Sequence, residues 1–326
     1  MFSEEDDSSI YTFTKEGKII RLHNFVESAG GIIYADTVEI ASSVGCPLGG
    51  KFMPGSQVLY FADAVLGLCR IDVSKKFPKI ELVASKVTEK DGRVTPILYA
   101  DDVDIGPKSG MVYFSDASDI PPYRNPDHTF DVLYSYKMDF LRNKASGRLI
   151  RYNPNTEKVD VLADGIAFAN GVAVDESERF VLISETSRFR VLKYHLVGPK
   201  QGEVEAMVDS LVGHVDGVDC ISNSSGLCYI AIPTCVSSIV KILFKMPNNI
   251  EAIVRTMIMM LPKSFVPSPD NFTGVLEIDS KQGIARRMIQ DPNGEDVKMI
   301  TGVTVHGKNL YLGSLHNDFI GVYDLY

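Results

Sequence analysis

The sequence predicts an all-β fold, and more specifically a six-bladed β-propeller that carries helical insertions on one face. The clearest evidence is the block 147–202, where short β-type runs alternate with turn residues. Asn153-Pro154-Asn155 is one such turn, because proline presets φ and asparagine tolerates left-handed geometry. Short strands with turn signals about every 8–12 residues are typical of sandwiches, barrels and propellers. The runs lie at 148–152, 159–162, 167–174, 180–185 and 190–196.

A recurring strand motif selects the propeller among these folds. The motif reads apolar–Tyr–apolar–small–polar in its clearest copies, and six copies give units of roughly 54 residues. This length is slightly above that of a propeller blade once insertions are allowed. The copies lie at 10–13, 58–63, 111–116, 180–185, 227–231 and 310–314.

From the second copy onward, each copy is preceded by a strand that we expect to line a central channel, and each unit has an outer strand after its motif. We therefore interpret residues 1–326 as a single propeller domain. Its first blade is expected to be truncated, because no inner strand is recognisable upstream of Tyr11. The expected inner strands are 46–52, 100–106, 168–175, 214–221 and 300–306, and the outer strands are 67–72, 148–152, 190–196, 239–241 with 275–279, and 319–325.

Two insertions, 119–146 and 242–273, separate inner from outer strands in the third and fifth units. The second insertion predicts a helix, because its apolar residues recur at helical spacing. We favour packing of this helix on the rim of the propeller, and the alternative is a lid over the central pocket. The apolar residues are Ile250, Ile253, Val254, Ile258 and Leu261.

Charge and cysteine content exclude several classes of function. The net charge is −9, from 33 basic and 42 acidic side chains, and no basic run is present. A nucleic-acid partner is therefore not expected, whereas a small cationic or amine substrate suits this field. None of the five cysteines has C-x-x-C spacing, which disfavours zinc and thioredoxin-type chemistry. The odd count leaves at least one thiol outside any intramolecular disulfide.

The sequence contains no segment that we expect to enter a membrane. Residues 1–9 are acidic and polar, without the apolar stretch of a signal peptide. The most apolar helical candidate, 250–261, is too short to span a bilayer and contains Glu251 and Arg255. We expect a soluble chain, located in the secretory-pathway lumen or vacuole if an upstream signal or anchor has been removed.

Several long segments resemble the strictosidine synthase-like family of six-bladed propellers, and together they cover nearly the whole chain. The same propeller class includes, more distantly, the paraoxonases and other calcium-dependent lactonases. The segments that carry the resemblance are CPLGGKF (46–52), LYFADAVLGLCRID (59–72), YADDVDIGPKSGMVYFSDAS (99–118), the block 147–202, and NLYLGSLHNDFIGVYDL (309–325).

The resemblance implies a calcium site at the mouth of the channel, built from oxygen ligands on the inner strands. It places these ligands at Asp101 of YADDVDI, Asn170 of FANG and Asp216 of HVDGVDC. The family glutamate of the first blade has no clear counterpart, and Glu4 or Glu5 could replace it. A different interpretation makes Asp101, Asp102 and Asp104 structural carboxylates that bind backbone amides between blades. Asn170 could likewise be a buried structural amide.

The resemblance leaves the catalytic residue unassigned. The glutamate base of strictosidine synthases falls on Thr301, and a hydroxyl cannot act as that base near neutral pH. Asp296, just upstream, is a weak replacement candidate. The paraoxonase histidine falls on Leu48.

Other polar residues have a simpler structural interpretation. A carboxylate recurs at one position of three units, Asp63, Asp116 and Glu185, where we expect it to bind turns within its blade. His306 and His316 flank the last blade's motif and are interpreted as core or rim residues.

Three functions remain open from the sequence. The first is a calcium-assisted hydrolase of a small ester or lactone, with the substrate in the central channel. The second is a strictosidine synthase-type condensation of an amine with an aldehyde, a lyase-class reaction. The third is a propeller that binds a ligand or partner without catalysis. We place the hydrolase first because three inner strands each supply an oxygen ligand.

Overall fold

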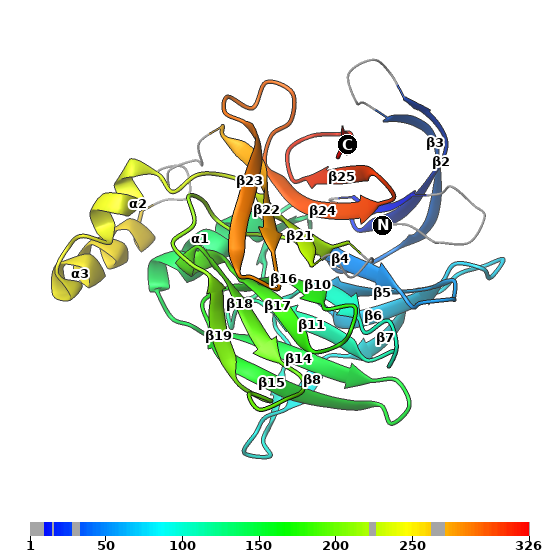
Figure 1. Cartoon of the computed structure of the whole chain (residues 1–326), viewed down its shortest axis with the longest axis horizontal. Helices are drawn as coiled ribbons and strands as arrows, with labels where there is room; N and C mark the ends of the chain where they lie inside the picture. The colour runs from blue at the N-terminus through cyan, green and yellow to red at the C-terminus, as the bar shows by residue number, and fades with distance from the viewer. Residues whose placement is uncertain (1–9, 15, 28–32, 222–225, 262–270, 326) are drawn as a thin grey trace.

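The computed structural model describes residues 10–14, 16–27, 33–221, 226–261 and 271–325, and these form a six-bladed β-propeller. Six sheets stand around a common centre, so the predicted fold class is confirmed (Figure 1). The first blade contains β1 (Ile10–Phe13), β2 (Lys18–Glu27) and β3 (Ile33–Ser42). The second contains β4 (Pro47–Phe52), β5 (Val58–Asp63), β6 (Gly67–Asp72) and β7 (Glu81–Ala84). The third contains β10 (Ala100–Ile105), β11 (Val112–Asp116), β14 (Gly147–Asn153) and β15 (Lys158–Ile166). The fourth blade contains β16 (Ala169–Val174), β17 (Phe180–Glu185), β18 (Arg190–His195) and β19 (Val204–Val208). The fifth contains β20 (Val218–Cys220), β21 (Leu227–Ile232), β22 (Thr273–Asp279) and β23 (Ile284–Asp291). The sixth contains β24 (Ile300–His306), β25 (Asn309–Ser314) and β26 (Gly321–Asp324).

Within each blade, consecutive strands pair antiparallel, and the apolar core lies between neighbouring blades. Leu68 of β6, for example, packs in one cluster with Val103 of β10 and Phe114 of β11. Val191 of β18 packs in another cluster with Ile230 of β21. Because the central strands of the blades, such as β5, β11 and β17, are buried against neighbouring sheets, these strands read as nearly continuous apolar runs.

The third blade is wider than the others. The connection from β7 to β10 forms a hairpin of β8 (Lys86–Thr88) and β9 (Val94–Pro96), and β8 pairs parallel with β15. Arg148 of β14 holds this hairpin, since its guanidinium donates to the side chains of Glu89 and Thr95 at 2.6 and 2.7 Å.

Both predicted insertions contain helices. The first holds the short hairpin β12 (Tyr123–Arg124) and β13 (Phe130–Asp131), followed by α1 (Val132–Arg142). The second region holds α2 (Ser238–Leu243) and α3 (Asn248–Met259). The outer strand predicted at 239–241 is therefore wrong. Ser237 accepts a hydrogen bond from the Val240 amide and so begins α2 there.

The carboxylate that recurs in three blades has the structural role predicted for it. Asp63 accepts hydrogen bonds from the backbone amides of Cys46 and Val65, at 2.9 and 3.0 Å. Asp116 accepts from the Tyr99 amide and Glu185 from the Ala167 amide, each at 2.8 Å. In each case the carboxylate fixes the residue that leads into an inner strand, and this sets where that strand starts.

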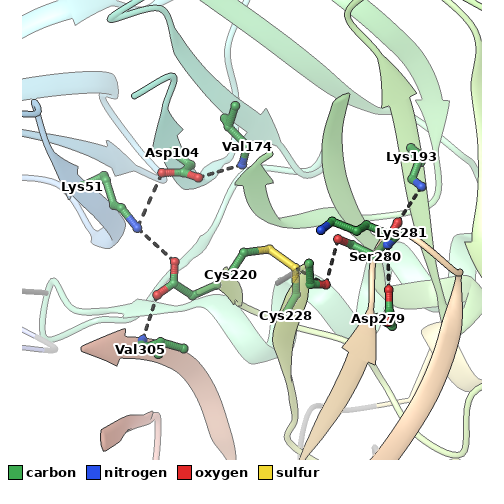
Figure 2. Close-up of a disulfide and its surroundings, with 12 residues drawn as sticks. Lys51, Asp104, Val174, Lys193, Cys220, Cys228, Asp279, Ser280, Lys281 and Val305 are labelled. Carbon is green, nitrogen blue, oxygen red and sulfur yellow. Dashed lines mark hydrogen bonds and ion pairs between the residues drawn. A yellow bond between two sulfur atoms is a disulfide. The ribbon is translucent and has the colours of Figure 1, made fainter. Parts of the chain in front are cut away.

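One disulfide, Cys220–Cys228, joins β20 to β21 at directly opposite positions of the pair (Figure 2). Cys46, Cys69 and Cys235 are not disulfide-bonded. Across the described residues, no helix combines the length and the apolar character needed to cross a membrane.

Candidate functional site

The inner strands present one side chain each to the centre of the molecule through a repeated irregularity. The register of β4, β10, β16 and β24 shifts near the start of each strand, which is where a bulge redirects a side chain. The segment that leads into β20 supplies the corresponding residue of the fifth blade. We call these five residues the first ring: Leu48, Asp101, Asn170, Asp216 and Thr301, all of which line one cavity.

Glycines behind the first ring let the inner strands approach one another closely. A Cβ added to Gly171 would lie 2.4 Å from the Asp216 carbonyl oxygen, and one added to Gly217 would lie 2.7 Å from the Thr301 carbonyl oxygen. Both contacts are with backbone atoms, which cannot move aside. The N-G and D-G pairs of the sequence are therefore needed to bring Asn170 and Asp216 to the axis.

The cavity above the first ring has a volume of about 990 Å³. One wall is α1, which is held there because Tyr136 packs edge-on against Phe168, with ring centroids 4.9 Å apart. Further along the wall, Leu243 of α2 and Ile258 of α3 reach the cavity. Both insertions therefore help to build the pocket, as a lid would. The rim-packing interpretation is wrong for most of the predicted apolar stripe, because Ile250, Ile253 and Leu261 remain exposed.

The first ring carries two carboxylates and one amide. Burial raises the pKa of Asp101 well above its usual value, and the nearby Asp216 carboxylate raises it further. Burial, followed by the charge of Asp102, raises the pKa of Asp216 to about 8, although a hydrogen bond from the Asn170 side chain favours its charged form. Among the described residues, neither carboxyl group forms an ion pair, so this ring needs either protonated carboxyl groups or a bound cation to balance its charge.

Three residues further along the inner strands lies a cluster that we call the second ring: Lys51, Asp104 and Asp219. The Lys51 ammonium lies 2.9 Å from a carboxylate oxygen of Asp219 and 3.6 Å from one of Asp104 (Figure 2). Burial alone would lower the pKa of Lys51, but these carboxylates raise it above its usual value. The second oxygen of Asp219 accepts from the Val305 amide at 2.8 Å, and that of Asp104 from the Val174 amide at 2.7 Å.

The structural interpretation of the aspartates at 101, 102 and 104 holds for Asp102 and Asp104. Asp102 binds the Val172 amide at 2.9 Å and Asp104 binds the Val174 amide, so both join β10 to the next blade. Asp101 faces the cavity beside Asp216.

A histidine and a tyrosine of the cavity wall were not identified by sequence reasoning. His214 is 8% exposed, and its Nδ1 lies 2.5 Å from the Tyr136 hydroxyl. Its ring packs edge-on against Phe140 and Phe189. Burial lowers the pKa of His214 to about 4, so the imidazole is neutral near pH 7. The only sequence signal was its place two residues before Asp216, while its partner comes from an insertion.

The other sequence candidates have different positions. Thr301 lines the cavity, and its carbonyl accepts from the Gly217 amide at 2.9 Å. Asp296 is exposed, is absent from the cavity lining and has its amide bound to Asp291, so it does not reach the channel. His306 lines the cavity and His316 is exposed. Glu4 and Glu5 lie outside the described residues.

The donor set of the first ring fits a calcium ion. Carboxylate and amide oxygens from Asp101, Asn170 and Asp216 are hard ligands of the kind calcium takes, and a cation would relieve the repulsion between the two carboxylates. No group of three or more His, Cys, Asp or Glu residues among the described residues could hold a metal. A cation at the first ring would therefore have two carboxylates and the Asn170 amide as its side-chain ligands.

Comparisons with known proteins agree with this architecture. A family model described as strictosidine synthase matches residues 101–199. The chain is 30% identical to two Arabidopsis thaliana proteins, strictosidine synthase-like 13 and strictosidine synthase-like 10. The matches cover 80% of this chain and 60% of the first protein, and 88% of this chain and 71% of the second. It is also 27% identical to the adipocyte plasma membrane-associated protein of Rattus norvegicus, over 95% of this chain and 79% of that protein.

Among solved structures, a gluconolactonase of Xanthomonas campestris is similar in fold. The superposition has a TM-score of 0.57 at 12% sequence identity and covers 95% of this chain and 83% of that chain. At this identity the similarity establishes the fold alone.

Proposed function

The chain belongs to the strictosidine synthase-like family, and we propose that it is a calcium-assisted hydrolase of a small ester or lactone bound in the central cavity. The observation that carries this proposal is the convergence of Asp101, Asn170 and Asp216 on the cavity, where the two carboxyl groups have no basic partner among the described residues. Partly buried carboxylates without a positive partner are costly in a purely structural role, but they are what a bound cation requires.

Asp101, Asn170 and Asp216 would hold the ion, and Asn170 would serve through its amide oxygen while its NH₂ group donates to Asp216. When bound, calcium supplies a positive charge that can polarise a substrate carbonyl. The chain's own contribution is a large cavity with aromatic walls, from Tyr99, Tyr136 and other rings, which favours an apolar acyl or lactone group.

His214 adds a polar side chain to the wall of the cavity. Its neutral imidazole is oriented by the Tyr136 hydroxyl and by the rings of Phe140 and Phe189. We expect it to hydrogen bond to a polar atom of the substrate and so to orient the ester, without carrying charge into the pocket.

Isothermal titration of calcium into chelator-stripped protein, followed by an ester and lactone panel, tests this function. Asn170→Ala should weaken calcium binding by more than about 10-fold and abolish hydrolysis. The matched control is Leu48→Val, which changes the same ring at a residue without an oxygen ligand and should leave calcium binding unchanged. Hydrolysis that is indifferent to chelator would refute the metal-assisted mechanism.

An amine–aldehyde condensation is the second candidate. Thr301 occupies the position of the family base, but two carboxylates beneath aromatic walls also suit a protonated aryl amine. The candidates differ in their response to calcium, which should activate hydrolysis and compete with an amine. Incubation with tryptamine and a small aldehyde, with and without calcium, tests this. If neither ester turnover nor condensation product is found, the remaining function is non-catalytic binding.

We also propose a secretory-pathway location. The Cys220–Cys228 disulfide supports it, because disulfides persist mainly in oxidising compartments. The protein from its native source is alkylated before any reduction and then examined by mass spectrometry. Cys220 and Cys228 should carry no alkyl group, whereas Cys46 should be found as a thiol outside any disulfide. Alkylation of Cys220 and Cys228 would contradict the location.

A further inference from the structure

The second insertion exposes a large apolar surface to solvent. Residues 238–261 form α2, α3 and their connection, and Figure 1 shows both helices beyond the ring of blades. Seven large apolar side chains in this segment are between 43% and 81% exposed, and we call them the lid face. They are Ile242, Phe244, Ile250, Ile253, Met257, Met260 and Leu261. A contiguous apolar surface of this kind usually marks an interaction site.

Apart from Phe244, whose ring also packs against Phe140 and Phe189, the lid face does not make the contacts that hold the helices on the propeller. Leu243 is buried and reaches the cavity. Arg255 is 3% exposed, pairs with Glu251 at 2.8 Å and donates to the Phe140 carbonyl of α1. Its guanidinium also stacks 4.9 Å from the centroid of the Phe140 ring. The helices are therefore anchored through these side chains, while most of the lid face is exposed among the described residues.

The charges around the lid face are basic. Within 238–261 the exposed charged side chains are Lys241 and Lys245. The acidic residue of this segment, Glu251, is paired with the buried Arg255. This local excess of positive charge contrasts with the net charge of −9 for the chain. An acidic protein partner would suit the lysines but leave the seven apolar side chains without a match.

We propose that the lid face docks onto the surface of an anionic phospholipid membrane. Apolar side chains would enter the boundary between headgroups and acyl chains while Lys241 and Lys245 contact anionic headgroups, as in interfacial amphipathic helices. This proposal does not depend on the hydrolase function. Its consequence for the cavity is positional: Leu243 and Ile258 of the same helices line the pocket, so docking holds the pocket wall at the membrane.

Flotation with vesicles of phosphatidylcholine, with or without phosphatidylserine, tests the apolar contribution. The wild-type protein should float with the phosphatidylserine vesicles, and the double variant Ile253→Asp/Met257→Asp should bind at least about tenfold more weakly. The matched control is Phe77→Asp, a change at a side chain that is 76% exposed elsewhere on the molecule, which should bind like the wild type. All variants should share the wild-type circular dichroism and melting temperature, because the altered side chains are exposed.

The double variant Lys241→Glu/Lys245→Glu tests the electrostatic contribution separately. Binding to phosphatidylserine vesicles should weaken at least about fivefold per lysine and should become less sensitive to salt. Failure of the folded wild-type protein to float with either vesicle would overturn the proposal. So would self-association that the Ile253→Asp/Met257→Asp variant abolishes, since the lid face would then be an interface between copies of this chain.

Discussion

The second ring comes from three of the five blades that supply the first ring, three residues further along the chain in each, yet the charges of the two rings are balanced in opposite ways. In the second ring, Lys51 lies between Asp104 and Asp219, and both carboxylates also accept backbone amides of the next blade. In the first ring, Asp101 and Asp216 lie close together without a cation. The second ring is complete as it stands, whereas the first requires protonation or a bound cation.

This difference separates residues that hold the propeller together from residues that are available for function. Burial raises the pKa of carboxylates in both rings, so that shift alone does not identify the site. The distinguishing feature is whether the chain itself supplies the compensating charge and hydrogen bonds.

The largest expected effect is at the glycine behind the first ring. Gly171→Ala should destabilise the protein by about 3 kcal/mol, because its Cβ would meet backbone atoms of the next blade within 2.8 Å. Gly302→Ala is a matched control at the same repeat position, since its nearest neighbour would be 3.8 Å away. Urea denaturation measures both. Equal costs for the two variants would show that close approach of the inner strands does not position the first ring.

Removal of the Lys51 ammonium group should have the next largest effect on stability. Lys51→Met leaves Asp104 and Asp219 without a counter-charge and should destabilise the protein by about 2 kcal/mol. The cost is moderate because the Lys51 side chain is 39% exposed toward the cavity. Urea denaturation reports the change, and Lys51→Arg serves as the charge-preserving control. An unchanged midpoint for Lys51→Met would mean that the second ring contributes nothing to stability.

The smallest effect should have the opposite sign. In calcium-free protein at pH 8, Asp216→Asn removes an uncompensated carboxylate but also loses the hydrogen bond that the Asn170 side chain donates to it, so the net stabilisation of the fold should be about 1 kcal/mol. The unfolded chain loses its Asp216 proton near pH 4, whereas the folded protein keeps it until about pH 8. Wild-type stability should therefore fall across this pH range, and the fall should be smaller in the variant. Thermal melts at several pH values with chelator test this, and parallel curves would contradict it.

Much of the fold and part of the site could be predicted from the sequence because their signals are local. The strand 180–185 was predicted with the bounds that the structure gives it. The resemblance to a known family placed Asn170 and Asp216 at the central channel, and both do line the cavity. The strand predicted at 239–241 was wrong, because a capping serine and the packing of the insertion outweighed strand propensity there.

The parts that sequence reasoning missed depend on contacts between distant segments. Lys51 and Asp219 are 168 residues apart in sequence and meet only because the ring of blades closes around them. Tyr136 and His214 are 78 residues apart and meet because an insertion folds back over the cavity. No periodicity or spacing in the sequence encodes either pair.

The hairpin of β8 and β9 has a consequence for how the molecule behaves in concentrated solution. An uncovered strand at the border of a sheet is a template on which another chain can assemble, and natural proteins shield such borders. Here the linker between two blades covers the outer edge of β15 by pairing with it. Arg148 holds this linker in place through hydrogen bonds to Glu89 and Thr95. A defect in this fastening would therefore appear first as aggregation of otherwise folded molecules, with the propeller itself intact.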